Sequence, residues 1–372
     1  MSFQNESLLR PPVARAAYSD RTAWLMAEMS RLAYERFESP AEMLDGLVAQ
    51  LSSLQDAGRM KEAIERFVQE LPRQAGEGRE RLERSLAAAG FELVVTFDNG
   101  GTQAYLARRD ADGMAVLAFR GTEKDFRDIK TDLNARFYAR GGTRTHSGFL
   151  DAFRFVEPAI RRAVEELGNS KLYLTGHSLG GALALIAARS LSSDNVAACY
   201  TFGSPKVGNE EFGDAIKVPI YRVVNAADSV PSLPPTWLWE ILIGLAWALP
   251  IPYVRRAVLA LTQQFRGYRH HGDMRYLADC PEDFSDLRLV ANPSLVDRAR
   301  WIAARLAADI KAGVRDHAIS DYCEKLEAFA VQRLDERDAR WSGRPGSAGE
   351  PERAGERPAG RVPSDRSVRS PE

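Results

Sequence analysis

KLYLTGHSLGG, residues 171–181, places an apolar, β-prone run directly before a Gly-x-Ser-x-Gly pentad, and an Ala/Leu-rich helical pattern begins immediately afterwards. This order predicts a strand, a sharp turn with Ser178 at its apex, and a helix. Gly176 and Gly180 allow neighbouring backbone to pass close to the turn. A hydroxyl held there sits at a helix N-terminus, where amide groups stabilise negative charge. The stretch therefore favours a hydrolytic nucleophile at Ser178 over a structural turn.

The composition is that of a globular protein: of 372 residues, 27% are charged and 45% are hydrophobic. A formal net charge of −1 provides no basic field for a nucleic-acid partner. The three cysteines are scattered and have no metal-type spacing, which favours reduced thiols and no metal site. The first residues lack the apolar segment of a secretory signal, so we expect a cytoplasmic location.

The residue pattern divides the chain into three regions. Residues 1–90 have helical periodicity and are expected to form an N-terminal extension or cap. In residues 91–340, strand-like runs alternate with helical ones, which predicts an α/β fold with a mostly parallel central sheet flanked by helices on both faces. Residues 341–372 are rich in Gly, Pro, Ser, Arg and Glu, a composition typical of a disordered tail.

A serine nucleophile needs a base and an acid that orients the base, and in such a sheet the chain order is Ser, Asp or Glu, His. Asp228 follows an apolar strand pattern and precedes prolines, which suits the orienting acid better than a turn cap. Three histidines come later in the chain, at His270, His271 and His317. We assign the base to His270, in a short loop, because His317 falls in a long helical region where histidines are usually packed or exposed.

An oxyanion hole needs two backbone donors. One is expected to be the amide of Leu179, directly after the nucleophile. The other is expected at Thr122, at the end of the strand-like run 115–121. Thr122 is alternatively the N-cap of a following helix.

Several motifs together resemble the class 3 lipases, a branch of the α/β hydrolases. They run in order over residues 90–280, at Phe119–Thr122, His146–Phe149, Gly176–Gly181, Thr201–Asn209, Val224–Pro231 and Tyr268–Gly272. Lys206 stands where the family usually has arginine, and two residues separate Asn225 from Asp228. The resemblance implies an α/β-hydrolase fold without a cofactor, places the oxyanion role on Thr122, and selects His270 over His271.

Two apolar segments bear on the substrate. By its position, residues 125–137 correspond to the family's lid, although an ordinary surface helix fits as well; its apolar stripe is Phe126, Ile129 and Leu133. An insert at residues 236–262 is too short and too interrupted by proline to span a bilayer. It is expected either to contact lipid or to form the wall of an acyl pocket, and it contains Trp237, Trp239 and Trp247.

These observations predict a serine carboxylic-ester hydrolase, a lipase that cleaves acyl esters of glycerolipids through an acyl-enzyme. A phospholipase A1 and a small-ester esterase are the enzymatic alternatives, and a catalytically inactive lipid- or membrane-binding module is the alternative from another class. The expected partners are an acyl-ester substrate and the surface of a membrane or lipid droplet. The oligomeric state is left open.

Overall fold

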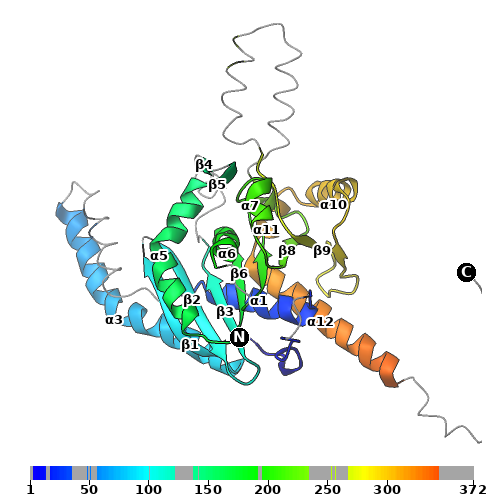
Figure 1. Ribbon diagram of the computed structural model, residues 1–372, viewed down its shortest axis with the longest axis horizontal. Helices are drawn as coiled ribbons and strands as arrows, with labels where there is room; N and C mark the ends of the chain where they lie inside the picture. Colours follow the sequence, from blue (N-terminus) through cyan, green and yellow to red (C-terminus); the bar gives the residue numbers. More distant parts are fainter. Residues whose placement is uncertain are drawn as a thin grey trace, which may run out of the picture. The chain divides into compact units, whose positions relative to one another are not determined.

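The computed structural model describes residues 3–13, 17–35, 48, 51, 57–99, 101–121, 137–140, 142–191, 195–233, 253, 256 and 267–342. Among these residues, a central eight-stranded sheet has the order β1-β2-β3-β6-β7-β8-β9-β10 (Figure 1). Its strands are β1 Glu92–Asn99, β2 Thr102–Arg109, β3 Met114–Phe119, β6 Lys171–His177, β7 Val196–Phe202, β8 Ile220–Asn225, β9 Asp273–Leu277 and β10 Leu289–Ala291.

The five strands β3, β6, β7, β8 and β9 run parallel, and antiparallel pairs extend the sheet at both edges. This confirms the predicted α/β-hydrolase architecture, a mostly parallel sheet flanked by helices. A separate antiparallel pair consists of β4 Phe137–Arg140 and β5 Thr143–His146.

Helices precede, connect and follow the strands of the sheet. Their bounds are α1 Asp20–Leu32, α3 Ala57–Ala88, α5 Ser147–Glu165, α6 Leu179–Ser190, α7 Glu210–Asp214, α10 Leu295–Ala308, α11 Ala312–Arg315 and α12 Ile319–Ser342, with short 3-10 turns η1 Glu6–Leu8 and η2 Val230–Ser232. None of the described helices is long and apolar enough to cross a membrane.

Alternation along β6 explains how the sheet is covered on both faces. Leu172 and Leu174 belong to the apolar cluster formed with α5 and α6, whereas Thr175 hydrogen-bonds Ser30 on α1 at 2.8 Å. Successive side chains of a strand point to opposite faces. The α5–α6 layer and α1 therefore lie on opposite sides of the central strands.

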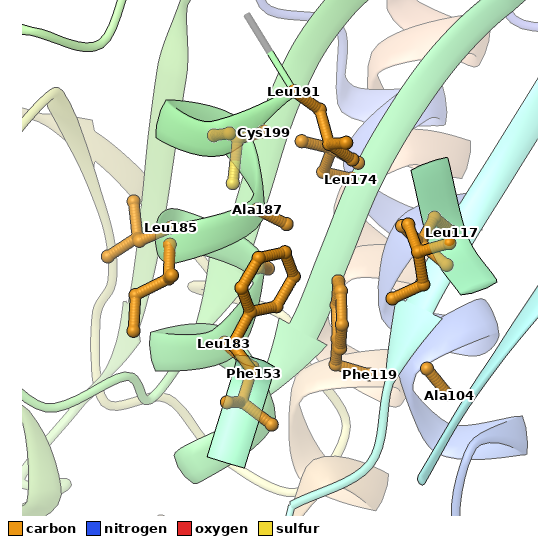
Figure 2. Packing of buried hydrophobic residues seen from close by; sticks show 14 of the residues in the cluster. Ala104, Leu117, Phe119, Phe153, Leu174, Leu183, Leu185, Ala187, Leu191 and Cys199 are labelled. Carbon is orange, nitrogen blue, oxygen red and sulfur yellow. The ribbon is translucent and has the colours of Figure 1, made fainter. Parts of the chain in front are cut away.

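The main core lies between the sheet and the α5–α6 layer (Figure 2). Phe119 of β3 and Phe153 of α5 have ring centroids 6.2 Å apart, and both side chains are buried. The apolar sequence of α6 is buried over nearly its whole length because this helix lies between the sheet and α5. The core thus fixes α6, the helix that begins directly after Ser178.

Residues Met1–Gln332 form one compact unit, and residues 333–372 form a second. The N-terminal helix α1 contacts β3, β6 and β7, so it belongs to the same unit as the sheet. The predicted boundary at residue 90 stays a prediction. The predicted tail, from residue 343 on, lies outside the described residues.

Candidate active site

The predicted strand–turn–helix is present at Ser178, between the end of β6 and the start of α6. Ser178 has φ 56° and ψ −126°, a left-handed conformation that is strained for a residue with a side chain. The packing around it requires glycine: a Cβ on Gly176 would overlap the carbonyl group of Gly180, and a Cβ on Gly180 would overlap that of Phe119. The turn therefore holds the serine in one fixed orientation. Ser178 is 1% exposed, which shields its hydroxyl from water.

The imidazole of His317 connects Ser178 to Asp228. Its Nε2 lies 2.9 Å from Ser178 Oγ, and its Nδ1 lies 3.0 and 2.9 Å from the two carboxylate oxygens of Asp228. An ionised carboxylate can only accept, so Nδ1 carries the proton and Nε2 accepts from the serine hydroxyl. This hydrogen-bond chain has the geometry in which a histidine can remove the proton of a serine nucleophile.

Asp228, the predicted acid, is held after the end of β8 by two further donors. The Val230 amide donates to Oδ1 at 3.0 Å, and the Tyr322 hydroxyl donates to Oδ2 at 2.6 Å. Tyr322 Oη also accepts the amide hydrogen of Asn225 at 3.0 Å. Burial first, and then the charge of Asp228, raise the pKa of Tyr322, which keeps its proton available for this bond. The carboxylate is thus fixed in orientation by β8 and α12 together.

His317 occupies the turn between α11 and α12, and the preceding residue ties this turn to the sheet. The Asp316 carboxylate accepts the Ala227 amide at 2.9 Å and pairs with Arg305 at 3.0 Å. The Asn225 side chain donates to the Asp316 carbonyl at 2.9 Å. These contacts join the turn to the residues that follow β8, next to the acid.

The structure does not bring His270, the predicted base, to Ser178, and the assignment is corrected to His317. His270 Nε2 donates to the Pro231 carbonyl at 2.6 Å. The physical reason is topological: His270 precedes β9, which runs parallel to β8. Sites in such sheets form beyond the carboxyl ends of the strands, whereas His270 stands before the amino end of β9, and its Nε2 is bonded to the Pro231 carbonyl instead of to Ser178.

His271 is not at the site either: it borders a cavity of about 500 Å³ that also contacts α7, Tyr221 and Asp273. The sequence did contain a signal for His317. The motif around His270 runs directly into the strand-like residues 274–277, which placed it at the amino end of a strand. His317 also satisfies the chain order serine, acid, histidine. The helical pattern continues on both sides of residues 316–318, so the sequence did not reveal the turn that separates α11 from α12 there.

A second histidine, His177, supports the backbone of the first. Its Nε2 lies 2.8 Å from the carbonyl oxygen of His317, and its Nδ1 lies 2.8 Å from the hydroxyl of Tyr34. A carbonyl oxygen can only accept, so Nε2 is the protonated nitrogen and Nδ1 accepts from Tyr34. Burial, followed by the proximity of His317, lowers the pKa of His177 well below its usual value, which keeps the ring neutral.

One of the two predicted oxyanion donors can be placed. Leu179 is the first residue of α6, and the first amides of a helix have no partner within the helix. Thr122 lies outside the described residues, but Gly121 precedes it and packs against the turn: a Cβ on Gly121 would lie 2.6 Å from the His177 carbonyl oxygen. The chain at Gly121 therefore lies directly beside the nucleophile turn.

The remaining predicted contacts lie outside the described residues, namely Phe126, Ile129, Leu133, Trp237, Trp239 and Trp247. Over the described ranges, no group of three or more His, Cys, Asp or Glu side chains is arranged to hold a metal ion.

Comparison with known proteins gives a consistent family. The profile of the family described as Lipase (class 3) matches residues 116–237, which include Ser178 and Asp228. A lipase of Rhizopus oryzae is 29% identical over 221 residues, covering 51% of this chain and 56% of that protein. The secreted mono- and diacylglycerol lipase 1 of Fusarium solani is 36% identical over 151 residues, covering 36% and 44%.

Among solved structures, the Rhizomucor miehei triacylglyceride lipase aligns with a TM-score of 0.43 and 26% identity, over 56% of this chain and 73% of that one. The chain spans about half the length of the curated relatives it matches.

Proposed function

We propose that this chain, which belongs to the class 3 lipase family, is a serine carboxylic-ester hydrolase that cleaves acyl esters of glycerolipids. The observation that carries the proposal is the continuous hydrogen-bond chain Ser178–His317–Asp228. It supplies a nucleophile, a base and an orienting acid in a nearly closed site. Metal chemistry is not needed for acyl transfer of this kind.

In the proposed reaction, Ser178 Oγ attacks the ester carbonyl carbon while His317 Nε2 takes the hydroxyl proton. Asp228 holds the imidazole in the tautomer with the proton on Nδ1 and stabilises the imidazolium that forms. The imidazolium then returns its proton to the leaving alcohol as the tetrahedral intermediate collapses to an acyl-enzyme. Water repeats the cycle, with His317 again as the base, and releases the fatty acid.

Negative charge on the carbonyl oxygen is proposed to rest on the Leu179 amide and on Thr122. Leu179 is suited to this role because its amide lies at the N-terminus of α6. A preorganised donor of this kind typically contributes about 10²–10³-fold to kcat.

The test compares the purified full chain with three single variants on p-nitrophenyl esters of increasing chain length. Ser178→Ala and His317→Ala should each lose about 10³-fold or more in kcat. His270→Asn, which keeps a donor for the Pro231 carbonyl, should retain most of kcat. Turnover at the background level in the unmodified chain would favour the inactive lipid-binding alternative. If His270→Asn loses as much of kcat as Ser178→Ala does, His270 is the base, as the sequence predicted.

The preference for lipid over small soluble esters is proposed from the apolar segments 125–137 and 236–262. With tributyrin, we expect the rate to rise steeply once the substrate exceeds its solubility. Saturation below that limit would instead identify a small-ester esterase. Cleavage of phosphatidylcholine vesicles at a rate above that of a triacylglycerol emulsion would identify a phospholipase A1.

A further inference from the structure

Arg222 of β8 is an arginine buried within the protein, and it takes no part in the hydrogen bonds of the triad. It is 9% exposed, and its Nε and Nη1 have no hydrogen-bond partner. Leaving a buried charge unpaired costs several kcal/mol in general. The question is which group neutralises this guanidinium.

The strand pairing shows where Arg222 points. Its partner on β9 is Met274, and Val224, two residues further along β8, clusters with Met274 and Tyr276. Residues two apart on a strand face the same side, so Arg222 lies on the face that carries this cluster. Trp301 of α10 packs against the same cluster, with its ring centroid 5.3 Å from that of Tyr276. Arg222 is therefore in the layer between the sheet and α10.

A second guanidinium enters this layer from α10. Arg298 precedes Trp301 by three residues, about one helical turn, and so lies on the same side of the helix. Its Nε is also buried without a hydrogen-bond partner. Burial first, and then the charge of Arg298, lower the pKa of Arg222 to about 10. Two neighbouring positive charges thus share one buried layer.

No acid among the described residues forms an ion pair with Arg222. Asp273 is adjacent on β9, but it precedes Met274 and so points to the other face of the sheet. It accepts instead from the side chain of Asn292 at 3.3 Å. Across the strands Arg222 faces Thr201 of β7 and Met274 of β9, and neither side chain supplies a charge.

We propose that Arg222 and Arg298 form a binding site for an oxyanion, a carboxylate or a phosphate group, in the layer between the sheet and α10. A planar guanidinium group can donate two parallel hydrogen bonds to two oxygens of a carboxylate or of a phosphate. A cleaved acyl chain ends in a carboxylate, and a phospholipid headgroup carries a phosphate. The site is separate from the triad and its ligand binding does not depend on the proposed hydrolysis.

The experiment measures the melting temperature of the full chain while sodium phosphate or sodium butyrate is titrated at constant ionic strength. At a concentration a hundredfold above its dissociation constant, a ligand of the folded state should raise Tm by about 4 °C. Arg222→Met should abolish this rise, and Arg298→Gln should weaken binding about tenfold. Arg300→Met, an exposed arginine on the same helix, is the matched control and should respond as the unmodified chain does.

A further variant tests the charge itself. Met274→Glu supplies a carboxylate beside Arg222, so it should raise Tm without added anion and remove the response to phosphate and butyrate. Phosphate acting alone would identify a phosphate site, and butyrate acting alone a carboxylate site. The proposal is overturned if neither anion raises Tm, if Arg222→Met responds equally, or if Met274→Glu lowers Tm. In the sequence of residues 234–266, Glu240 is the single acidic residue. If added anion raises the Tm of Glu240→Gln but not that of the unmodified chain, the carboxylate of Glu240 is the anion that Arg222 and Arg298 bind. That result would overturn the proposal of an external ligand.

Discussion

At the scale of single residues, His177 has two bonds that determine each other. Because its Nε2 must donate to the His317 carbonyl, its Nδ1 must accept, and the Tyr34 hydroxyl is the donor in place. The rings of His177 and His317 are also close, with centroids 4.5 Å apart. Tyr34 therefore acts on the base through one intermediate side chain and is a positioning residue.

Tyr34→Phe should lower kcat about fivefold with little change in KM, since one hydrogen bond of roughly 1 kcal/mol that fixes the tautomer of His177 is lost. The matched control is Tyr105→Phe, which removes another buried hydroxyl, bonded to the Met29 carbonyl at 2.8 Å, far from the reacting atoms. Both variants should lose comparable stability in urea denaturation. If both also keep full kcat, the Tyr34–His177 pair has only a structural role.

At the scale of elements, the turn between α11 and α12 carries the base, and Asp316 is its anchor. Its carboxylate is 2% exposed and serves both the Ala227 amide and Arg305. The carbonyl of Asp316 also accepts the side chain of Asn225, the last residue of β8. The distance between base and acid therefore depends on one buried carboxylate.

Asp316→Asn keeps the size of the side chain but removes its charge. We expect a loss of about 2 kcal/mol in the free energy of unfolding, because Arg305 is partly exposed and retains Asp279 at 3.3 Å. The looser turn should lower kcat more than it raises KM, and the loss should be absent in Arg315→Gln, a change of an exposed residue at the end of α11. Unchanged kcat at reduced stability would show that the turn is held by other contacts.

The elements also show why the sequence predicted some parts of the site and not others. The turn at Ser178 is encoded locally, since glycines must stand at 176 and 180, and the apolar β8 delivers Asp228 directly. The base, His317, lies 139 residues after Ser178 in the chain, and no local sequence pattern indicates that the two are in contact. Residues 316–318 contain neither Gly nor Pro, so the helical periodicity on both sides concealed the turn.

At the scale of the whole molecule, the net charge near zero conceals three buried or half-buried histidines whose pKa is lowered. Burial is the main cause that lowers the pKa of His177, His270 and His271. In the unfolded chain, each has a pKa of about 6.5. Below that pH the unfolded state binds protons that the folded state does not, so stability must fall as the pH falls.

The fall should begin near pH 6.5 and approach about 1.4 kcal/mol per pH unit for each histidine that remains neutral. Carboxylates titrate mainly below pH 5, so urea denaturation between pH 7.5 and 5 isolates the histidines. His270→Asn should flatten the slope by about one proton while leaving the stability at pH 7.5 nearly unchanged, because asparagine can still donate to the Pro231 carbonyl. A slope identical to that of the unmodified chain would mean that His270 is protonated in the folded state. The lowering of its pKa by burial would then be wrong.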